Sequence, residues 1–327
     1  MATGVDAVVA GAGGFIGGHL VKNLLDEGKT VRAVDIKSFD HWYQVHETAD
    51  NLSRDLATVE AAQESVAGGV GEYYNLACNM GGMGFIENNK AACMLSVLPS
   101  THTLMAARDA GAERFFYASS ACVYAGYKQT DPNLTALKEE DAYPADAEDG
   151  YGWEKLFSER MCRHFREDFG LQTRIARYHN VYGPEGTWDG GREKAPAAAC
   201  RKVALAALTG NHEIEMWGDG EQTRSFTYID DCVKGTKMIT RGEFAEPINL
   251  GSSEMVSINQ LFALVAQIAG IEIRIRHIDG PLGVRGRNSD NTLIQKVYGW
   301  EPSISLREGM TQTYRWVYDK AKKAYDL

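Results

Sequence analysis

The sequence lacks any apolar run long enough to cross a membrane. No such stretch approaches the roughly 18 residues that a membrane-spanning helix needs. The first residues, MATGVDAVVAGAGG, pass directly into a strand-like run with no basic segment ahead of it. We therefore expect neither a membrane anchor nor a signal peptide, and a cytoplasmic location.

Paired cysteines and an excess of positive charge are also missing. The six cysteines are scattered and no two are spaced as CxxC, which favours reduced thiols over a disulfide framework or a metal site. The chain carries 34 Lys and Arg against 44 Asp and Glu, a formal net charge of −10. This balance argues against nucleic acid or an anionic membrane as a partner. It still permits a local basic pocket for a phosphorylated small molecule.

Short apolar runs alternate with helical patterns through the first half of the 327 residues. The strand-like runs lie at 5–11, 30–36, 72–78, 114–120 and 173–183, and the helical patterns at about 15–27, 100–111 and 150–168. Such alternation predicts an α/β fold with a doubly wound parallel sheet that is covered by helices on both faces.

The second half is less regular, and residues 184–230 mix Gly, Trp and basic residues. A late strand of the sheet is expected in 246–252. Ser257 is a plausible N-cap for a helix that ends at Gly270, and 271–278 alternates like a half-buried strand. The last twenty or so residues form an amphipathic helical pattern. A ligand would lie between this cap and the carboxyl ends of the parallel strands.

A glycine-rich loop stands between the first strand and the first helix, in VVAGAGGFIGGHL. Gly11, Gly14 and Gly17 suit a tight turn, the close approach of a pyrophosphate and close helix–strand packing. The helix N-terminus adds N–H groups and a positive dipole end. We predict that this loop, with Phe15 and Ile16, binds a dinucleotide.

Asp35 ends the second strand run, where an acid accepts hydrogen bonds from the adenosine ribose and repels a 2′-phosphate. It favours NAD over NADP, although nearby Lys37 would suit NADP. We expect an NAD-binding Rossmann domain in 1–183, to which 228–252 returns, and a smaller C-terminal α/β cap in 184–227 and 253–327.

Tyr151 and Lys155 lie four positions apart on a predicted helix and therefore share one face. A neighbouring ammonium favours the phenolate form of a tyrosine, whose free pKa is about 10. Tyr151 is thus a candidate base for removing an alcohol proton while a hydride leaves the same carbon. Ser120, at the end of the fourth strand run, could hold the same oxygen.

These motifs resemble those of the extended short-chain dehydrogenase/reductase family. They include the glycine loop, Asp35, NLAC at 75–78, Ser120 and Tyr151-x-x-x-Lys155, together with Asp55 and Leu56. The resemblance implies a nucleotide sugar bound in the cap and oxidised transiently at C4, with Asp55 and Leu56 near the adenine. A surface position for Asp55 is comparably consistent with the sequence.

Family members share the oxidation at C4 and differ in the step after it. A 4,6-dehydratase needs an acid pair where this chain has Ala121-Cys122, which disfavours that reaction. A 4-epimerase needs no further acid–base pair, whereas a 3,5-epimerase needs proton donors and acceptors on both ring faces. Cys122 and Lys194 fit the second requirement, with Arg192, Arg201 and Lys202 near Lys194 to lower its pKa. Without the resemblance, composition favours the alternative that Cys122 is an inert buried thiol and Lys194 a solvated loop lysine.

Longer strings resemble the GDP-mannose 3,5-epimerase family. They are NMGGMGFI, RFFYASSACVY, YHNVYGPEGTWDGGREKAPAAACRK, EMWGDGEQTRSFTYIDD and GVRGRNSDN. The resemblance implies that Cys122 and Lys194 are the acid–base pair and that Ser120, Tyr151 and Lys155 act at C4. It implies substrate contacts at Gly81, Ser120, Cys122, Asn180, Glu193, Lys194, Ala195, Lys202, Gln222, Arg224 and Arg287.

The basic members of this set suit a diphosphate, because arginine offers a planar fork of donors. Arg285 is a second candidate for the phosphates, with a surface salt bridge as its alternative. The stretch 124–144 and the pair Trp188-Asp189 depart from the family pattern, which bears on loop detail and product ratio.

Taken with the motifs, this resemblance implies an NAD-dependent epimerase that converts GDP-D-mannose to GDP-L-galactose, with GDP-L-gulose as a side product. A 4-epimerase on another nucleotide sugar is the nearest alternative, and a non-catalytic NAD-binding regulator is a more distant one. The family resemblance also implies a homodimer that associates through helices of the cofactor domain.

Overall fold

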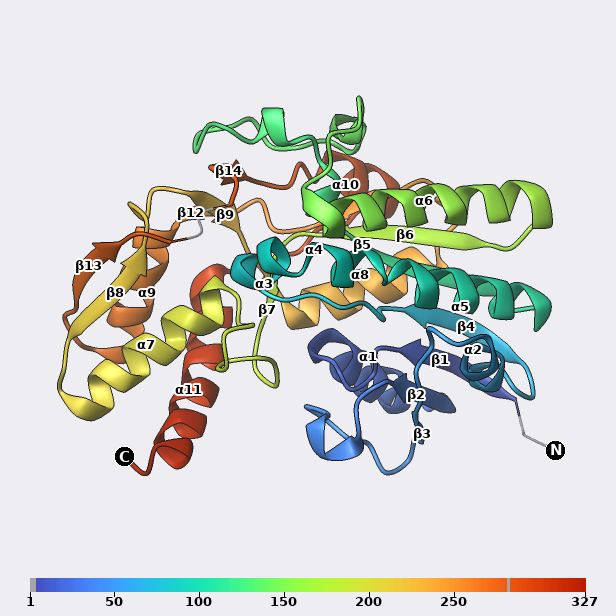
Figure 1. Ribbon diagram of the computed structural model, residues 1–327, viewed down its shortest axis with the longest axis horizontal. Helices are drawn as coiled ribbons and strands as arrows, with labels where there is room; N and C mark the ends of the chain where they lie inside the picture. Colours follow the sequence, from blue (N-terminus) through green and yellow to red (C-terminus); the bar gives the residue numbers. More distant parts are fainter. Residues whose placement is uncertain (1–3, 281–282) are drawn as a thin grey trace.

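The computed structural model describes residues 4–280 and 283–327. Its centre is a seven-stranded parallel sheet of order β11-β6-β5-β4-β1-β2-β3 (Figure 1). The strands are β1 (Val5–Ala10), β2 (Val31–Asp35), β3 (Asp50–Ser53), β4 (Val70–Asn75), β5 (Arg114–Ser120), β6 (Thr173–Tyr178) and β11 (Ile248–Leu250). The predicted doubly wound α/β fold is confirmed.

Helices cover both faces of the sheet. One face carries α1 (Phe15–Asp26) and α8 (Ile229–Arg241), and the other carries α2 (Val59–Ser65), α5 (Val97–Asp109) and α6 (Asp149–Phe169). Alternate residues of β1 point to opposite faces, so Val9 packs into the core under α1 and α8, and Val8 into the core under α2, α5 and α6. Burial on both faces explains why the strands are continuously apolar.

Two local details of the sheet differ from the sequence prediction. β3 has the sequence DNLS, with one apolar residue and little burial, so periodicity does not mark it. The run 173–183 divides into β6 and β7 (Val181–Tyr182), because Asn180 has a φ of +41°. β7 then pairs with β10 (Thr227–Tyr228) in a separate parallel pair.

The cap lies at one end of the sheet, at the left of Figure 1. Its helices α7 (Ala195–Thr209), α9 (Ile258–Ala269) and α11 (Leu306–Ala324) pack together. Its strands are β8 (Glu213–Trp217) paired with β13 (Arg274–Ile278), and β12 (Met255–Ser257) and β14 (Gly286–Arg287) on either side of β9 (Thr223–Ser225). Shorter elements are α3 (Met83–Asn88), α4 (Lys90–Met94), α10 (Thr292–Tyr298) and 3₁₀ turns at Phe39–His41, Ala121–Val123, Gly126–Lys128 and Glu139–Ala142.

The caps of α9 are confirmed: the Ser257 side chain accepts a hydrogen bond from the Gln260 N–H, and Gly270 ends the helix with a φ of +69°. Helix α7 was not expected inside the irregular stretch 184–230. Its Ala-rich sequence has high helix propensity, with Pro196 in the first turn and Gly210 as its left-handed cap. β13 is more exposed than expected, with three of its five residues at the surface.

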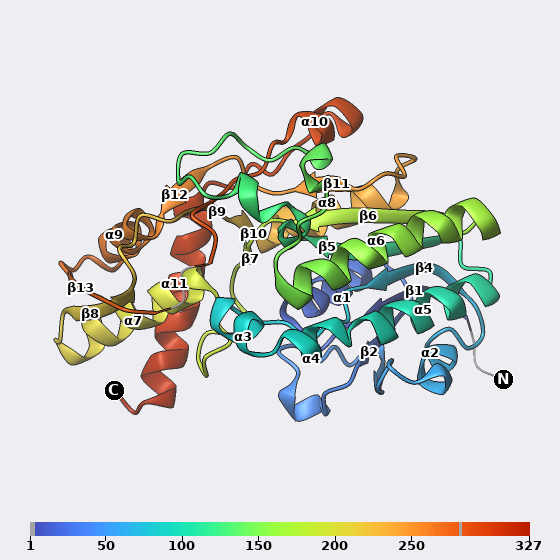
Figure 2. The same cartoon turned by 45° about the horizontal axis from the view of Figure 1, so that its top comes forward.

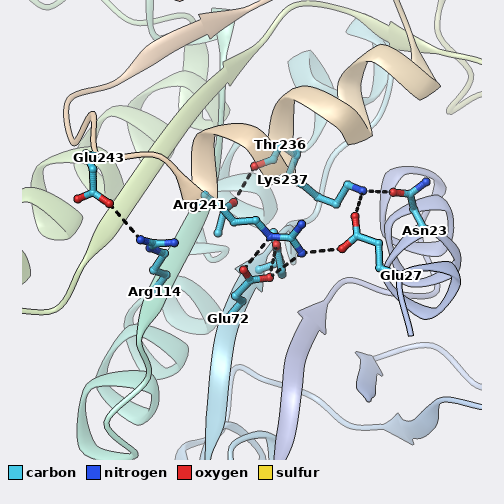
Figure 3. Close-up of polar contacts among 10 residues, drawn as sticks. Asn23, Glu27, Glu72, Arg114, Thr236, Lys237, Arg241 and Glu243 are labelled. Carbon is cyan, nitrogen blue, oxygen red and sulfur yellow. Dashed lines mark hydrogen bonds and ion pairs between the residues drawn. The ribbon is translucent and has the colours of Figure 1, made fainter. Parts of the chain in front are cut away.

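A network of charged side chains fixes α8 to the first half of the chain (Figure 3). Arg241 contacts Glu72 of β4 and Glu27 just beyond α1, each at 2.8 Å. Lys237, one turn earlier on α8, also pairs with Glu27. Together with β11, these contacts attach 229–250 to the central sheet. No helix within 4–280 and 283–327 has the length and apolar content to span a bilayer.

Candidate active site

The glycine loop forms the turn between β1 and α1 at the carboxyl edge of the sheet. Gly11 has a φ of +84°, and Gly14 precedes the first turn of α1, which Phe15 and Ile16 begin. A Cβ on Gly17 would lie 2.1 Å from the Gly11 carbonyl oxygen, so no larger residue fits there. The backbone N–H groups of the α1 N-terminus are left to face an anion, as a dinucleotide site requires.

Asp35 ends β2 beside this loop and is buried. Its Oδ1 accepts a hydrogen bond of 3.0 Å from the Lys37 N–H, while Lys37 Nζ donates to the Gly13 carbonyl at 2.5 Å. The Lys37 side chain thus lies against the loop. Asp55 is exposed and accepts from the Ala57 N–H, whereas Leu56 is buried in the core under α2. The residues around the loop fit NAD through the glycine turn and the buried acid.

Ser120 and Cys122 follow the carboxyl end of β5. The Ser120 Oγ accepts a hydrogen bond of 3.2 Å from the Cys122 N–H and caps the turn Ala121–Val123. Cys122 is 7% exposed and packs in a small cluster with Ile86, Cys93 and Tyr151. Burial, and then the Glu148 charge, raise the pKa of the Cys122 thiol, while Arg287 lowers it.

The start of α6 brings Tyr151 to Cys122. The Glu148 N–H donates to the Cys122 carbonyl at 2.9 Å, and Gly152 lies so close that a Cβ there would be 2.2 Å from the same oxygen. Lys155 Nζ lies 5.5 Å from the centre of the Tyr151 ring. Sequence spacing predicted that Tyr151 and Lys155 share a face, and this is confirmed.

The electrostatics of this pair differ from the expectation. Burial raises the pKa of Tyr151, Cys78 raises it further, and the Lys155 ammonium lowers it, so that the net shift is upward. Lys155 Nζ donates to the Tyr117 hydroxyl at 3.2 Å and lies 3.5 Å from Glu154, a buried carboxylate. The Lys155 ammonium therefore does not by itself offset the effect of burial on the Tyr151 pKa.

Lys194 immediately precedes α7 and is half-buried. Burial lowers its pKa and Arg287 lowers it further, against the raising effect of Cys122, Cys78 and Cys232. The three cations that were predicted to lower the Lys194 pKa have other partners. Arg201 pairs with Glu193, and Lys202 donates to the Glu215 carbonyl. Arg192 lies over the Phe85 ring. The direction of the predicted shift holds, but its cause is different.

Loop 186–194, which carries Glu193 and Lys194, packs on the segment before α3. The Gly82 N–H donates to the Arg192 carbonyl at 3.0 Å, and a Cβ on Gly82 would lie 2.7 Å from the Glu193 oxygen. Gly81 is buried against Phe85, and Ala195 begins α7. Two of the segments that carry the family resemblance thus meet in space.

Two arginines point into the same region from β9 and β14. Arg287 is 4% exposed and donates to Cys122 Sγ at 3.5 Å and to Glu148 at 2.6 Å. Arg224 is half-buried, and burial and then the Arg287 charge lower its pKa to about 10. Gln222 Oε1 is buried and has no hydrogen-bond partner among the residues that the structure describes. This orphaned acceptor suits a ligand hydroxyl or amine.

The remaining predicted contacts are placed less uniformly. Asn180 follows β6 and donates to the Ser225 carbonyl at 3.0 Å. The two terminal nitrogens of Arg285 donate to the Asp219 carboxylate oxygens at 3.0 and 3.1 Å near the surface. This is the surface salt bridge that was the alternative to a phosphate contact. Glu148 is a functional candidate that sequence reasoning missed, because its partner Arg287 lies 139 positions away.

Comparisons with known proteins give a consistent result. Residues 7–251 match the NAD dependent epimerase/dehydratase family. GDP-mannose 3,5-epimerase 1 of Oryza sativa subsp. japonica and GDP-mannose 3,5-epimerase of Arabidopsis thaliana are each 48% identical over 316 residues, covering 96% of this chain and 82% of theirs. The UDP-glucose 4-epimerase structure from Thermotoga maritima has a TM-score of 0.86 at 23% identity, covering 96% of this chain and 99% of that one. The likeness to the Thermotoga maritima structure shows the fold alone.

Proposed function

Because the chain belongs to the NAD-dependent epimerase/dehydratase family, we propose that it inverts C3 and C5 of GDP-D-mannose to give GDP-L-galactose. It is an isomerase that uses NAD without net redox, and GDP-L-gulose is the side product of inversion at C5 alone. The observation that carries the proposal is that Cys122 and Tyr151 share one buried cluster, and that the loop ending at Lys194 packs on the segment beside that cluster.

The cofactor is held by the glycine loop and Asp35, with Phe15 and Ile16 in the first turn of α1. When bound, NAD supplies a hydride acceptor for C4 and the hydride that is later returned. The N–H groups at the start of α1 would bind the pyrophosphate, and Asp35 would accept from the ribose. We propose that this domain spans 1–183 and 228–252 and that the rest forms the substrate cap.

Tyr151 takes the C4 hydroxyl proton, and Ser120 holds the same oxygen. Tyr151 is buried, and burial raises its pKa. The Lys155 ammonium lowers the Tyr151 pKa, and the positive nicotinamide ring of bound NAD would favour the phenolate further. Proton removal is thereby coupled to the presence of the cofactor.

Cys122 and Lys194 exchange protons at C3 and C5. A ketone at C4 acidifies the hydrogens on both flanking carbons, so each needs only a group able to accept and return a proton. Cys122 has a raised pKa and Lys194 a lowered one, which brings the proton affinities of the two groups closer together. The lowered pKa makes the neutral, proton-accepting form of Lys194 more accessible, whereas the raised pKa favours the protonated, proton-donating form of the Cys122 thiol. A 4-epimerase would need neither group.

The pocket charge fits a diphosphate. Arg224, Arg287 and Lys194 are partly or fully buried cations, and Glu148 is the carboxylate among them. This local excess of positive charge contrasts with the overall charge of −10. A buried cluster of cations is stabilised by a bound dianion. We propose that Gln222, Asn180 and Lys202 contact the nucleotide or sugar.

We further propose a homodimer in the cytoplasm. Helices α5 and α6 lie side by side (Figure 2). Large apolar side chains are exposed on them, with exposed fractions of 39% for Leu98, 38% for Met105, 44% for Trp153 and 55% for Phe157. Met94, at the end of α4, is 50% exposed. An apolar patch of this kind on adjacent helices suits a contact with a second copy.

The proposal is tested by substrate choice. The purified protein with NAD is incubated separately with GDP-mannose and with UDP-glucose, and the released sugars are separated by chromatography. Galactose and gulose from GDP-mannose alone support the proposal. Galactose from UDP-glucose alone would instead identify a 4-epimerase, and no turnover of either with NAD bound would indicate a regulator.

A further inference from the structure

Glu148 is a buried carboxylate in the immediate surroundings of Cys122. It is the residue before α6, its side chain is 11% exposed, and its N–H donates to the Cys122 carbonyl at 2.9 Å. Although burial opposes ionisation, the Arg287 charge lowers the pKa of Glu148. The carboxylate is therefore ionised at neutral pH and lies beside a thiol that must gain and lose a proton.

Arg287 joins this carboxylate to the thiol. Its Nη2 lies 2.6 Å from Glu148 Oε2, and its Nη1 donates to Cys122 Sγ at 3.5 Å. Its Nε donates to Gln129 Oε1 at 2.7 Å. One guanidinium thus has three different partners, and all four side chains are largely buried.

The guanidinium is planar, so two fixed partners determine where its third edge points. Gln129 is fixed, because its Nε2 donates to the Tyr124 and Ala125 carbonyls at 3.1 and 3.4 Å. The Glu148 backbone is held by its hydrogen bond to the Cys122 carbonyl, and its side chain is largely buried. With Gln129 on one edge and Glu148 on another, the remaining N–H group is directed at the sulfur.

Several charged or titratable groups act on the thiol from the surrounding elements. Glu148 precedes α6 and Arg287 lies on β14, and they act in opposite directions on the Cys122 pKa. Lys194 before α7, Arg224 of β9 and Tyr151 of α6 also interact electrostatically with Cys122. Glu148 is the carboxylate of this group, so its removal changes the balance of charge around the thiol.

We propose that Glu148 is a positioning residue for Cys122: it holds the Arg287 guanidinium against the sulfur and opposes the loss of the thiol proton. The inference rests on the proposed function for the catalytic role of Cys122, and on the contacts above for the rest. Replacing Glu148 by glutamine removes a negative charge next to the thiol, and the amide oxygen still accepts from Arg287, so that the guanidinium charge stays at the sulfur without a counter-ion. Both effects stabilise the thiolate.

Alkylation of Cys122 measures this directly and needs no sugar. The NAD-loaded protein is treated with iodoacetamide from about pH 6 to about pH 10, and modification of the Cys122 peptide is followed by mass spectrometry, with the Cys78 peptide as an internal reference. In the unmodified protein we expect Cys122 to titrate above the free thiol value of about 8.5. In Glu148→Gln we expect a titration lower by about one unit, and alkylation near neutral pH about tenfold faster.

Two further variants separate the effect of the Glu148 charge on the Cys122 titration from the effect of a disturbed structure. Glu148→Asp keeps the charge, so Cys122 should titrate within a few tenths of a unit of the unmodified protein. Glu246→Gln removes a carboxylate that pairs at 2.6 Å with Arg166, a residue near the end of α6 that is remote from Cys122. It should leave the Cys122 titration unchanged. An unchanged titration in folded, NAD-loaded Glu148→Gln would overturn the inference.

The measurement also distinguishes this inference from the proposed function. If Glu148→Gln does not fold, a Cys122 titration below about 8.5 in the unmodified protein overturns the inference by itself. If the titration shifts as expected but GDP-mannose is not turned over, the proposed function fails and the inference about Glu148 stands. Where turnover is present, the pH profile of deuterium uptake at C5 should shift with the thiol, while hydride transfer at C4 should not.

Discussion

Replacing Gly152 by alanine would place a methyl group at the contact between α6 and the loop that carries Cys122. The added Cβ would lie 2.2 Å from the Cys122 carbonyl oxygen and 3.3 Å from the Ala147 carbonyl carbon. Non-bonded heavy atoms at their optimal separation lie roughly 3.5 Å apart. The Cys122 backbone must therefore retreat by about 1 Å, or α6 must move away by a similar distance.

The effect on stability should be modest, because two contributions oppose each other. Overpacking of this kind costs about 1–3 kcal/mol, whereas alanine in place of glycine within a helix contributes about 1 kcal/mol. The effect on catalysis should be larger. A displacement of about 1 Å in a catalytic group can lower the rate about 100-fold. The predicted variant is folded, slightly less stable and severely impaired.

The assay combines thermal unfolding with the rate of deuterium uptake at C5 of GDP-mannose. Gly126→Ala is the matched control, since its added Cβ would meet its nearest atom, Asp146 Oδ2, at 3.5 Å. This control should unfold and exchange like the unmodified protein. A Gly152→Ala protein that exchanges deuterium at the normal rate would refute the account of how α6 positions Cys122.

Three other outcomes are expected from the geometry of the site. Gly17→Ala, whose Cβ would lie 2.1 Å from a loop carbonyl, should abolish NAD retention, measured by nucleotide analysis of the purified protein. Lys155→Met removes the ammonium that lowers the Tyr151 pKa. Because the phenolate is the base, the rising limb of the pH–rate profile at saturating NAD should move to higher pH by about one unit. Phe157→Glu, at a position 55% exposed, should give monomers in sedimentation velocity if the proposed dimer uses this face.

The sequence predicts correctly those helix ends and strands that depend on residues close together in the chain. The caps at Ser257 and Gly270 and the apolar runs of β1 and β5 depend on residues adjacent in the chain. β3 was missed because its four residues have little apolar character. Helix α7 was missed because the glycine-rich, basic residues before it dominated the stretch in which it lies.

The candidate site depended on tertiary contacts that no local pattern encodes. Tyr151 and Lys155 could be paired from helical spacing, but the burial of the pair and its interaction with Cys78, which follows β4, depend on the tertiary fold. The Cys122–Arg287 contact joins residues 165 positions apart. Cys122 itself was predicted from its matching neighbourhood, because a buried cysteine alone is typical of an inert core residue.

The central claim is that Cys122 and Lys194 move protons at C3 and C5 while Tyr151 serves C4. It is tested most directly by incubating the NAD-loaded protein and two variants with GDP-mannose in D₂O and locating the deuterium by mass spectrometry. The unmodified protein should incorporate deuterium at C3 and C5. Cys122→Ala and Lys194→Ala should still reduce the cofactor transiently, seen as NADH absorbance, but should incorporate no deuterium at C5. Normal exchange at C5 in both variants would contradict the account.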